Sequence, residues 1–153
     1  ISTYITNLAQ RDLHEEHSQQ HVKYLYIINE LEHIGDIIVR LAMEQQKAVA
    51  QGIGFLPKDL QDLHELFVIV GANYARALKG FEDDDFQLAA GVIREQPEVF
   101  KLEKDLRFYH FSRMTSAEHG SAEASSIYLD MVNSILRINF HAVGICQTVI
   151  GIV

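Results

Sequence analysis

The sequence predicts an all-α fold, an up-and-down bundle of four to six long helices, and three observations support it. The 153 residues include only two prolines and nine glycines, so few positions interrupt a regular element. Apolar residues recur every three or four positions over most of the chain, which is the spacing of one helix face. No segment alternates strongly enough to compete as a strand. With 48% hydrophobic residues, residues 1–153 are expected to form one globular domain.

The first predicted helix is the longest. Between Ser2 and Gln51 the chain has no proline and a single glycine, Gly35. Apolar residues repeat at helical spacing, at Tyr24, Ile27, Ile28, Leu31, Ile34, Ile38 and Leu41. The pattern predicts an amphipathic helix, with a break near Asp12 to Ser18, that ends at the Gly-Ile-Gly-Phe-Leu-Pro sequence of residues 52–57.

A second helix is predicted from Pro57, a residue suited to the first helical turn, to Gly80. Its expected seam consists of Leu60, Leu63, Phe67, Val70, Tyr74 and Leu78. A third helix is expected from Asp85 to about Thr115, because the acidic run at residues 82–85 suits the unpaired amides of a helix start. Pro97 predicts a kink or break near Gln96.

The final helix is expected to open at Ser121 to Ala124 and to run to the C-terminus. Its apolar face consists of Ile127, Met131, Ile135, Ile138, Ala142 and Ile145. After Arg137 the remaining residues carry no formal charge apart from any that His141 takes up. We therefore expect this last stretch to be buried in the bundle.

Composition excludes some classes of function. The formal net charge is -8, and lysine and arginine are scattered, so we expect no nucleic-acid partner. The single cysteine, Cys146, favours a reducing compartment. No apolar run is long enough to span a membrane. Because the chain opens at Ile1, we expect a fragment of a longer protein, in which membrane helices preceding Ile1 stay an open alternative.

The two ends of the chain are related to each other. Shifting the sequence by 104 residues pairs residues 24–42 with residues 128–146. Identical pairs are Tyr24 with Tyr128, Leu25 with Leu129, Asn29 with Asn133, Ile34 with Ile138 and Val39 with Val143. Such self-similarity predicts two related helices in related surroundings.

These segments resemble a known family. Leu31 to Asp36, LEHIGD, is similar to the repeated signature of PhoU-like helical-bundle domains, roughly Leu-Glu-Arg-Ile-Gly-Asp, although Arg40 stands where the family usually has asparagine. Leu136 to His141, LRINFH, with the preceding SSIYLDMVNSI, most resembles the C-terminal domain of bacterial sodium/phosphate cotransporter-related proteins, in which a PhoU-like bundle follows membrane helices.

The resemblance implies spectrin-like three-helix units, the second complete and the first partial. It implies a non-catalytic regulatory or scaffolding role in phosphate transport and homeostasis, on the cytoplasmic side of the bacterial inner membrane. The implied partners are the membrane part of the chain's own transporter, another transport or signalling protein, or a second copy in a homo-oligomer.

Glu32 and Asp36 are the candidate metal ligands. Residues four apart share one helix face, carboxylates bind hard and borderline cations, and PhoU domains are associated with metal clusters at this pattern. Against a divalent or iron-type metal, Arg40 follows Asp36 at the spacing of a helix ion pair. In the second copy Leu136 and Phe140 replace the two acids and are expected to widen the apolar stripe. We therefore favour a solvated or salt-bridged helix edge, and expect no cofactor.

Two further histidine patterns could bind metal. His14, His17 and His21 would line up on a helix as a chelate. Glu30 and His33 form one Glu-x-x-His pair of the kind found in ferritin-like carboxylate bundles, which need a second pair on another helix. His110, Ser125 and Cys146 lack the sequence context of an activated nucleophile. We expect no enzyme.

Three functions stay open. The first is a regulatory domain of a sodium/phosphate cotransporter-related membrane protein. The second is a stand-alone PhoU-type regulator of phosphate uptake and signalling that docks on other proteins. The third, a carboxylate-bridged metal-binding bundle, is the least favoured because partner pairs in register are missing.

Overall fold

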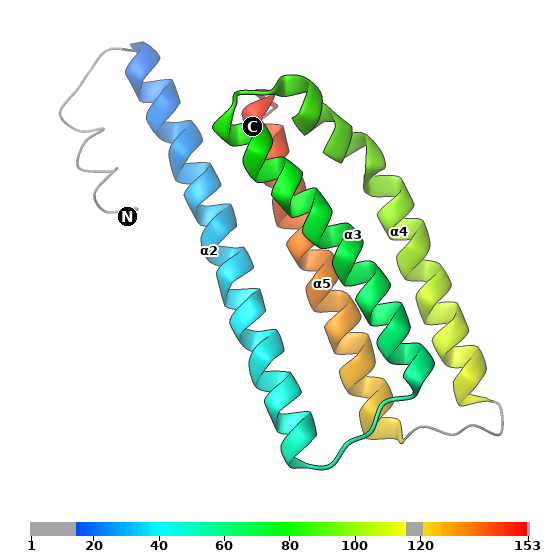
Figure 1. Ribbon diagram of the computed structural model, residues 1–153. Coiled ribbons are helices and arrows are strands. Elements are labelled where there is room, and N and C mark those ends of the chain that lie inside the picture. The colour runs from blue at the N-terminus through cyan, green and yellow to red at the C-terminus, as the bar shows by residue number, and fades with distance from the viewer. Residues whose placement is uncertain (1–14, 116–120, 153) are drawn as a thin grey trace.

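The computed structural model describes residues 15–115 and 121–152, and Figure 1 shows their arrangement. Four helices make up the described chain: α2 (Glu15–Ala50), α3 (Pro57–Glu82), α4 (Phe86–Met114) and α5 (Ala122–Val149). The described ranges contain no strand. The prediction of an all-α, up-and-down bundle is therefore confirmed.

The helices begin where local signals predicted. Pro57 opens α3. The Asp85 carboxylate accepts hydrogen bonds from the amides of Gln87 and Leu88 at the start of α4. The Ser121 hydroxyl likewise accepts from the amide of Ala124 at the start of α5. Each cap satisfies amides that have no partner within the helix.

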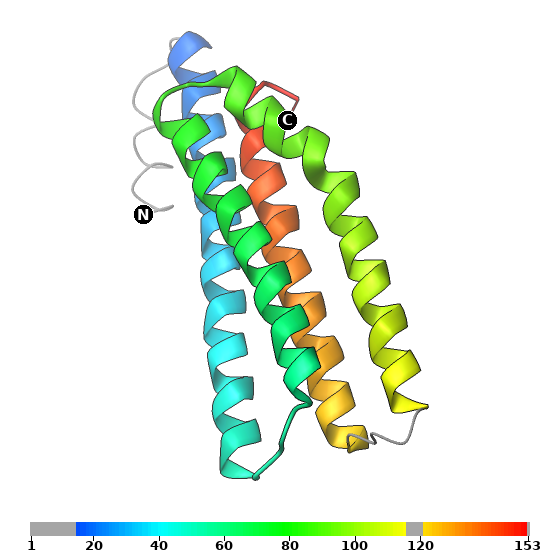
Figure 2. The ribbon, with the colours of Figure 1, turned by 45° about the vertical axis from the view of Figure 1, so that its right-hand side comes forward.

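Two expected interruptions have different outcomes. Pro97 lies inside α4, and the helix continues through it, so the predicted break does not occur; α4 instead bends in its N-terminal half (Figures 1 and 2). The break expected near residues 12–18 falls partly outside the described residues, and α2 is continuous from Glu15 onward.

The helices divide into a mutually packed trio and a single attached helix. α3, α4 and α5 pack closely against one another, whereas α2 packs closely against α5 and meets α3 through an edge-to-face contact of the Tyr24 and Phe81 rings. Figures 1 and 2 show α2 and α4 on opposite sides of the molecule, with α5 between them. This matches the expectation of one complete three-helix unit and one partial unit.

The core lies along α5. Its C-terminal half is buried, as expected, at Ile138, Asn139, Ala142, Val143, Ile145, Cys146, Thr148 and Val149. The repeat-related Ile34 and Ile138 are 1% and 5% exposed. Inside this core Asn73 donates a hydrogen bond to Asn139 over 2.8 Å. Because a buried amide without a partner is costly, the pair favours one register of α3 on α5.

The seam predicted for α2 and α3 is partly wrong. Ile38, Leu60 and Phe67 are 50%, 51% and 55% exposed, because the backbones of α2 and α3 do not pack closely and their facing sides lack cover. The expectation for α5 also fails in part. Leu136 packs against the core, but Phe140 is 63% exposed and does not widen a buried stripe.

Candidate functional site

An apolar groove runs between α2 and α3, with α5 as its floor, and encloses about 550 Å³. α2 contributes Ile34, Ile38, Leu41, Ala42 and Gln45; α3 contributes Leu60, Leu63, His64, Phe67, Val70, Gly71 and Tyr74; α5 contributes Met131, Ile135 and Ile138. A groove between two helices above a third has the shape that a further helix would fill.

None of the fifteen lining residues carries a formal charge, in a chain that is 22% charged. The charged residues of the same part of α2, namely Asp36, Arg40, Glu44 and Lys47, do not line the groove. Desolvating a charge against this lining would cost several kcal/mol. The groove therefore selects for a partner whose contacting face is apolar and uncharged.

The repeat shows why the groove exists. Ala142 and Val143 of α5 are 0% and 2% exposed, under cover from the neighbouring helices. Their counterparts 104 residues earlier, Ile38 and Val39 of α2, are apolar but 50% and 59% exposed. α2 thus carries the side chains of a core helix on a side that no described helix covers.

A buried ionic cluster joins the C-terminal end of α4 to the N-terminal end of α3. Asp59 and Asp62 of α3 are 4% and 3% exposed. Arg113 of α4 donates to Asp59 from Nε over 3.0 Å and to Asp62 from Nη2 over 2.7 Å. Burial alone would lower the pKa of the Arg113 guanidinium, but the hydrogen bonds to Asp59 and Asp62 outweigh it and raise that pKa.

The same cluster contains a serine–histidine–aspartate contact that sequence reasoning missed. His110 Nδ1 lies 3.1 Å from Asp59 Oδ1, and His110 Nε2 lies 2.7 Å from Ser125 Oγ. The three residues come from three helices and lie far apart in sequence, so no local motif announces them. The one available signal was that Asp59 shares a helix face with the apolar residues Leu63, Leu66 and Val70.

The surroundings of this contact favour a structural role. A nucleophilic serine needs room for a substrate and donors for an oxyanion. His110 is 1% exposed and its ring stacks on Tyr128, with centroids 4.2 Å apart. Asp59 already accepts from Arg113. Burial also raises the pKa of the Tyr128 hydroxyl far above its usual value. The arrangement can hold three helix ends in place.

A second polar contact joins α2 to α5. His141 Nδ1 lies 2.6 Å from Glu30 Oε2, and the His141 ring stacks on His33 with centroids 5.0 Å apart. Glu30 and His33, the Glu-x-x-His pair of α2, thus both contact His141 of α5. In the described part of the chain they do not face a second Glu-x-x-His pair of the kind that a carboxylate-bridged metal site needs. His141 was the one residue able to carry a positive charge in a stretch that otherwise has no formal charge, and such a residue in a buried helix signals a polar partner.

Glu32 and Asp36 lie on the exposed side of α2. Within residues 15–115 and 121–152, no three histidine, cysteine, aspartate or glutamate side chains are grouped so as to hold a metal ion. Glu32 and Asp36 stay candidate metal ligands, and a solvated or salt-bridged helix edge stays the favoured interpretation. Of the histidine triplet, His14 lies outside the described residues, the side chain of His17 is not described, and His21 is partly buried.

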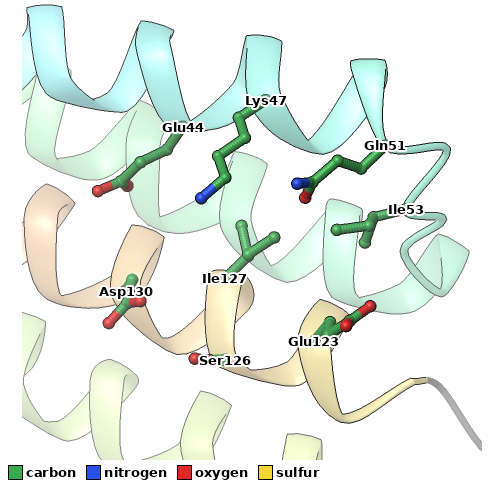
Figure 3. A pocket seen from close by; sticks show the side chains of 8 residues that line it. All are labelled: Glu44, Lys47, Gln51, Ile53, Glu123, Ser126, Ile127 and Asp130. Carbon is green, nitrogen blue, oxygen red and sulfur yellow. The ribbon is translucent and has the colours of Figure 1, made fainter.

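Figure 3 shows a pocket of about 480 Å³ between the C-terminal end of α2 and the N-terminal end of α5. Its charged residues are Glu44, Lys47, Glu123 and Asp130, and Lys47 reaches from α2 toward α5. Three carboxylates against one ammonium repel an anion. We therefore do not assign phosphate binding to this pocket.

Comparisons with known proteins identify a matching family model and several similar proteins. A family model described as the PhoU domain matches residues 63–149, most of α3 to α5 and more than half of the chain. Proteins named "Putative inorganic phosphate export protein YjbB" from Escherichia coli (strain K12), Shigella flexneri and Salmonella typhimurium are each 24% identical to this chain over 140 residues. No solved structure matches the chain significantly.

The relatives are much longer than this chain. Each alignment covers 91% of the chain and 26% of the relative, so the chain spans about a quarter of the length of the proteins it matches. Within the described ranges, no helix combines the length and apolar character needed to cross a bilayer. The family match coincides with the mutually packed trio α3, α4 and α5. On this match and this fold, the chain belongs to the PhoU domain family.

Proposed function

We propose that this chain is a non-catalytic regulatory and scaffolding domain of a sodium-dependent phosphate transport protein, lying on the cytoplasmic side of the inner membrane. One observation carries the proposal: the alignment spans nearly the whole chain but only a quarter of relatives named for inorganic phosphate export. The bundle corresponds to one section of such a protein. Transport of phosphate takes place elsewhere in the parent protein.

The groove between α2 and α3 supports a mechanism by docking. Its lining carries no formal charge and fits the apolar face of an amphipathic helix, and we assign that helix to the same transport protein. A domain regulates only through different affinities for different states of its target. A tenfold preference for one transport state shifts the balance between states by about 1.4 kcal/mol.

A charge placed in the groove tests this mechanism. In the full-length protein, Phe67→Glu is expected to change the rate of sodium-dependent phosphate transport several-fold, because an unpaired carboxylate cannot be buried against an apolar helix. Radiolabelled phosphate flux in cells measures the rate. Phe67 is 55% exposed, so the bundle itself should fold normally.

The matched control is Tyr26→Glu, at a residue of α2 that is 45% exposed and does not line the groove. It should leave the flux at the wild-type rate. Equal flux in wild type, Phe67→Glu and Tyr26→Glu would rule out regulation through the groove.

The competing function is a stand-alone regulator that docks on a separate transporter or sensor. The greater length of the relatives favours the transporter domain over the stand-alone regulator. A bundle that is part of a longer chain is held beside a target in the same chain. The reading frame that precedes Ile1 separates the two functions. Hydrophobic spans there support the transporter domain, and their absence supports the separate regulator.

A further inference from the structure

The outward side of the C-terminal half of α4 carries exposed aromatic residues. Phe100, Phe108 and Phe111 are 45%, 68% and 54% exposed, and exposed Lys104 lies between them in sequence. At about 100° per residue these four side chains fall within an arc of about 80°. Several large aromatic side chains on one exposed arc mark an interaction surface more often than a solvated one.

Positive charge accompanies the aromatic residues, although the chain as a whole has a net charge of -8. Lys101 and Lys104 are both exposed. The acids of this half of α4, Glu98, Glu103 and Asp105, lie about 100–120° away from Lys104 around the helix, and Glu103 is paired with Arg107. The aromatic arc is therefore free of acids.

The surface continues onto α5. Phe140 is 63% exposed, and a shallow hollow of about 530 Å³ between α4 and α5 is lined by Phe100, Asn133, Leu136, Arg137 and Phe140. We define the α4–α5 face as Phe100, Lys101, Lys104, Phe108, Phe111, Arg137 and Phe140. Within the described residues none of its three basic side chains is in an ion pair, so their charge is available to a partner.

We propose that the α4–α5 face adsorbs to the surface of an anionic lipid bilayer. Phenylalanine side chains on one side of a helix, with lysine and arginine beside them, are the composition of a helix lying in a membrane interface. α4 lies on the opposite side of the bundle from α2 (Figure 2), and all seven residues of the face are exposed, so a flat surface can reach them. Each basic side chain near such a surface contributes about fivefold in affinity.

The absence of tryptophan from the chain allows a clean optical test. In Phe108→Trp, anionic phosphatidylglycerol vesicles should shift the tryptophan emission to shorter wavelength as the indole enters the interface. Zwitterionic phosphatidylcholine vesicles should not, and high salt should reverse the shift. Tyr26→Trp, on α2, is the matched control and should show no shift with either vesicle.

Charge-removing variants test the electrostatic part. Lys101→Gln with Lys104→Gln should weaken binding to phosphatidylglycerol vesicles by roughly 30-fold. The control pair Lys23→Gln with Lys79→Gln removes the same charge elsewhere and should bind like wild type. Circular dichroism confirms that each variant is folded.

The proposal is wrong if Phe108→Trp shows no emission shift, if the chain binds both kinds of vesicle equally, or if the two lysine pairs lose equal affinity. Phe108→Trp emission that shifts with protein concentration without vesicles would instead identify a protein contact and would also contradict it. The measurements use the chain alone and no phosphate flux. Failure here therefore leaves the proposed docking groove untouched, and failure of the flux test leaves membrane adsorption untouched.

Discussion

Replacing Arg113 with methionine is expected to lower the free energy of unfolding by about 3–5 kcal/mol. Methionine keeps most of the apolar stem but removes the guanidinium, which leaves the carboxylates of Asp59 and Asp62 buried side by side. Lys58 reaches only Asp62, at 3.3 Å, and is itself largely exposed. Urea unfolding followed by far-ultraviolet circular dichroism at neutral pH measures the loss.

Lys79→Met is the control for this prediction. The Lys79 ammonium forms ion pairs with Glu82 and Asp83 on the surface, and exposed pairs of this kind contribute little to stability. If Arg113→Met cost no more than Lys79→Met, the buried cluster would not be holding the helix ends together.

The second large effect is a difference in stability between alanine substitutions at two adjacent isoleucines of α2, Ile37 and Ile38. Ile37 is 1% exposed and Ile38 is 50% exposed, because α2 turns the first toward α5 and leaves the second on the groove wall. Ile37→Ala should cost about 2–5 kcal/mol through lost burial and the cavity left behind. Ile38→Ala should cost less than about 1 kcal/mol. The same urea titration distinguishes them.

This pair tests the rotation of α2 about its own axis. A larger cost for Ile38→Ala would mean that α2 is turned by about one residue, or 100°, from the described orientation, and equal costs would mean a turn of about half that angle. The groove would then lose its α2 wall. The substitutions have the same size and lie next to each other in one helix, so propensity differences cancel.

The helices could be predicted from the sequence because their signals are local. Pro57, Asp85 and Ser121 sit at helix starts and act on amides within three residues. The periodic apolar pattern gave the fold class, and the similarity of the segments around Ile34 and Ile138 gave the family. The all-α prediction and the family were therefore within reach of the sequence.

The inter-helix arrangement was not predictable in the same way. The pattern that places Ile38, Leu60 and Phe67 on apolar faces says nothing about whether another helix covers them. Asp59, His110 and Ser125 meet only because three helix ends converge, and no spacing rule joins residues so far apart. Phe140 has the residue type of a core position, but its side chain points outward on the α4–α5 face.

Photo-crosslinking from the groove between α2 and α3 tests most directly whether the groove binds an amphipathic helix. A photoreactive benzoylphenylalanine replaces Phe67 in the full-length protein, and mass spectrometry identifies the peptide that it captures. We predict a crosslink to the apolar face of an amphipathic helix in the same protein, at a yield well above that from the same group at Tyr26. No crosslink above the Tyr26 control, or capture of a charged segment or of a different protein, would contradict the assignment.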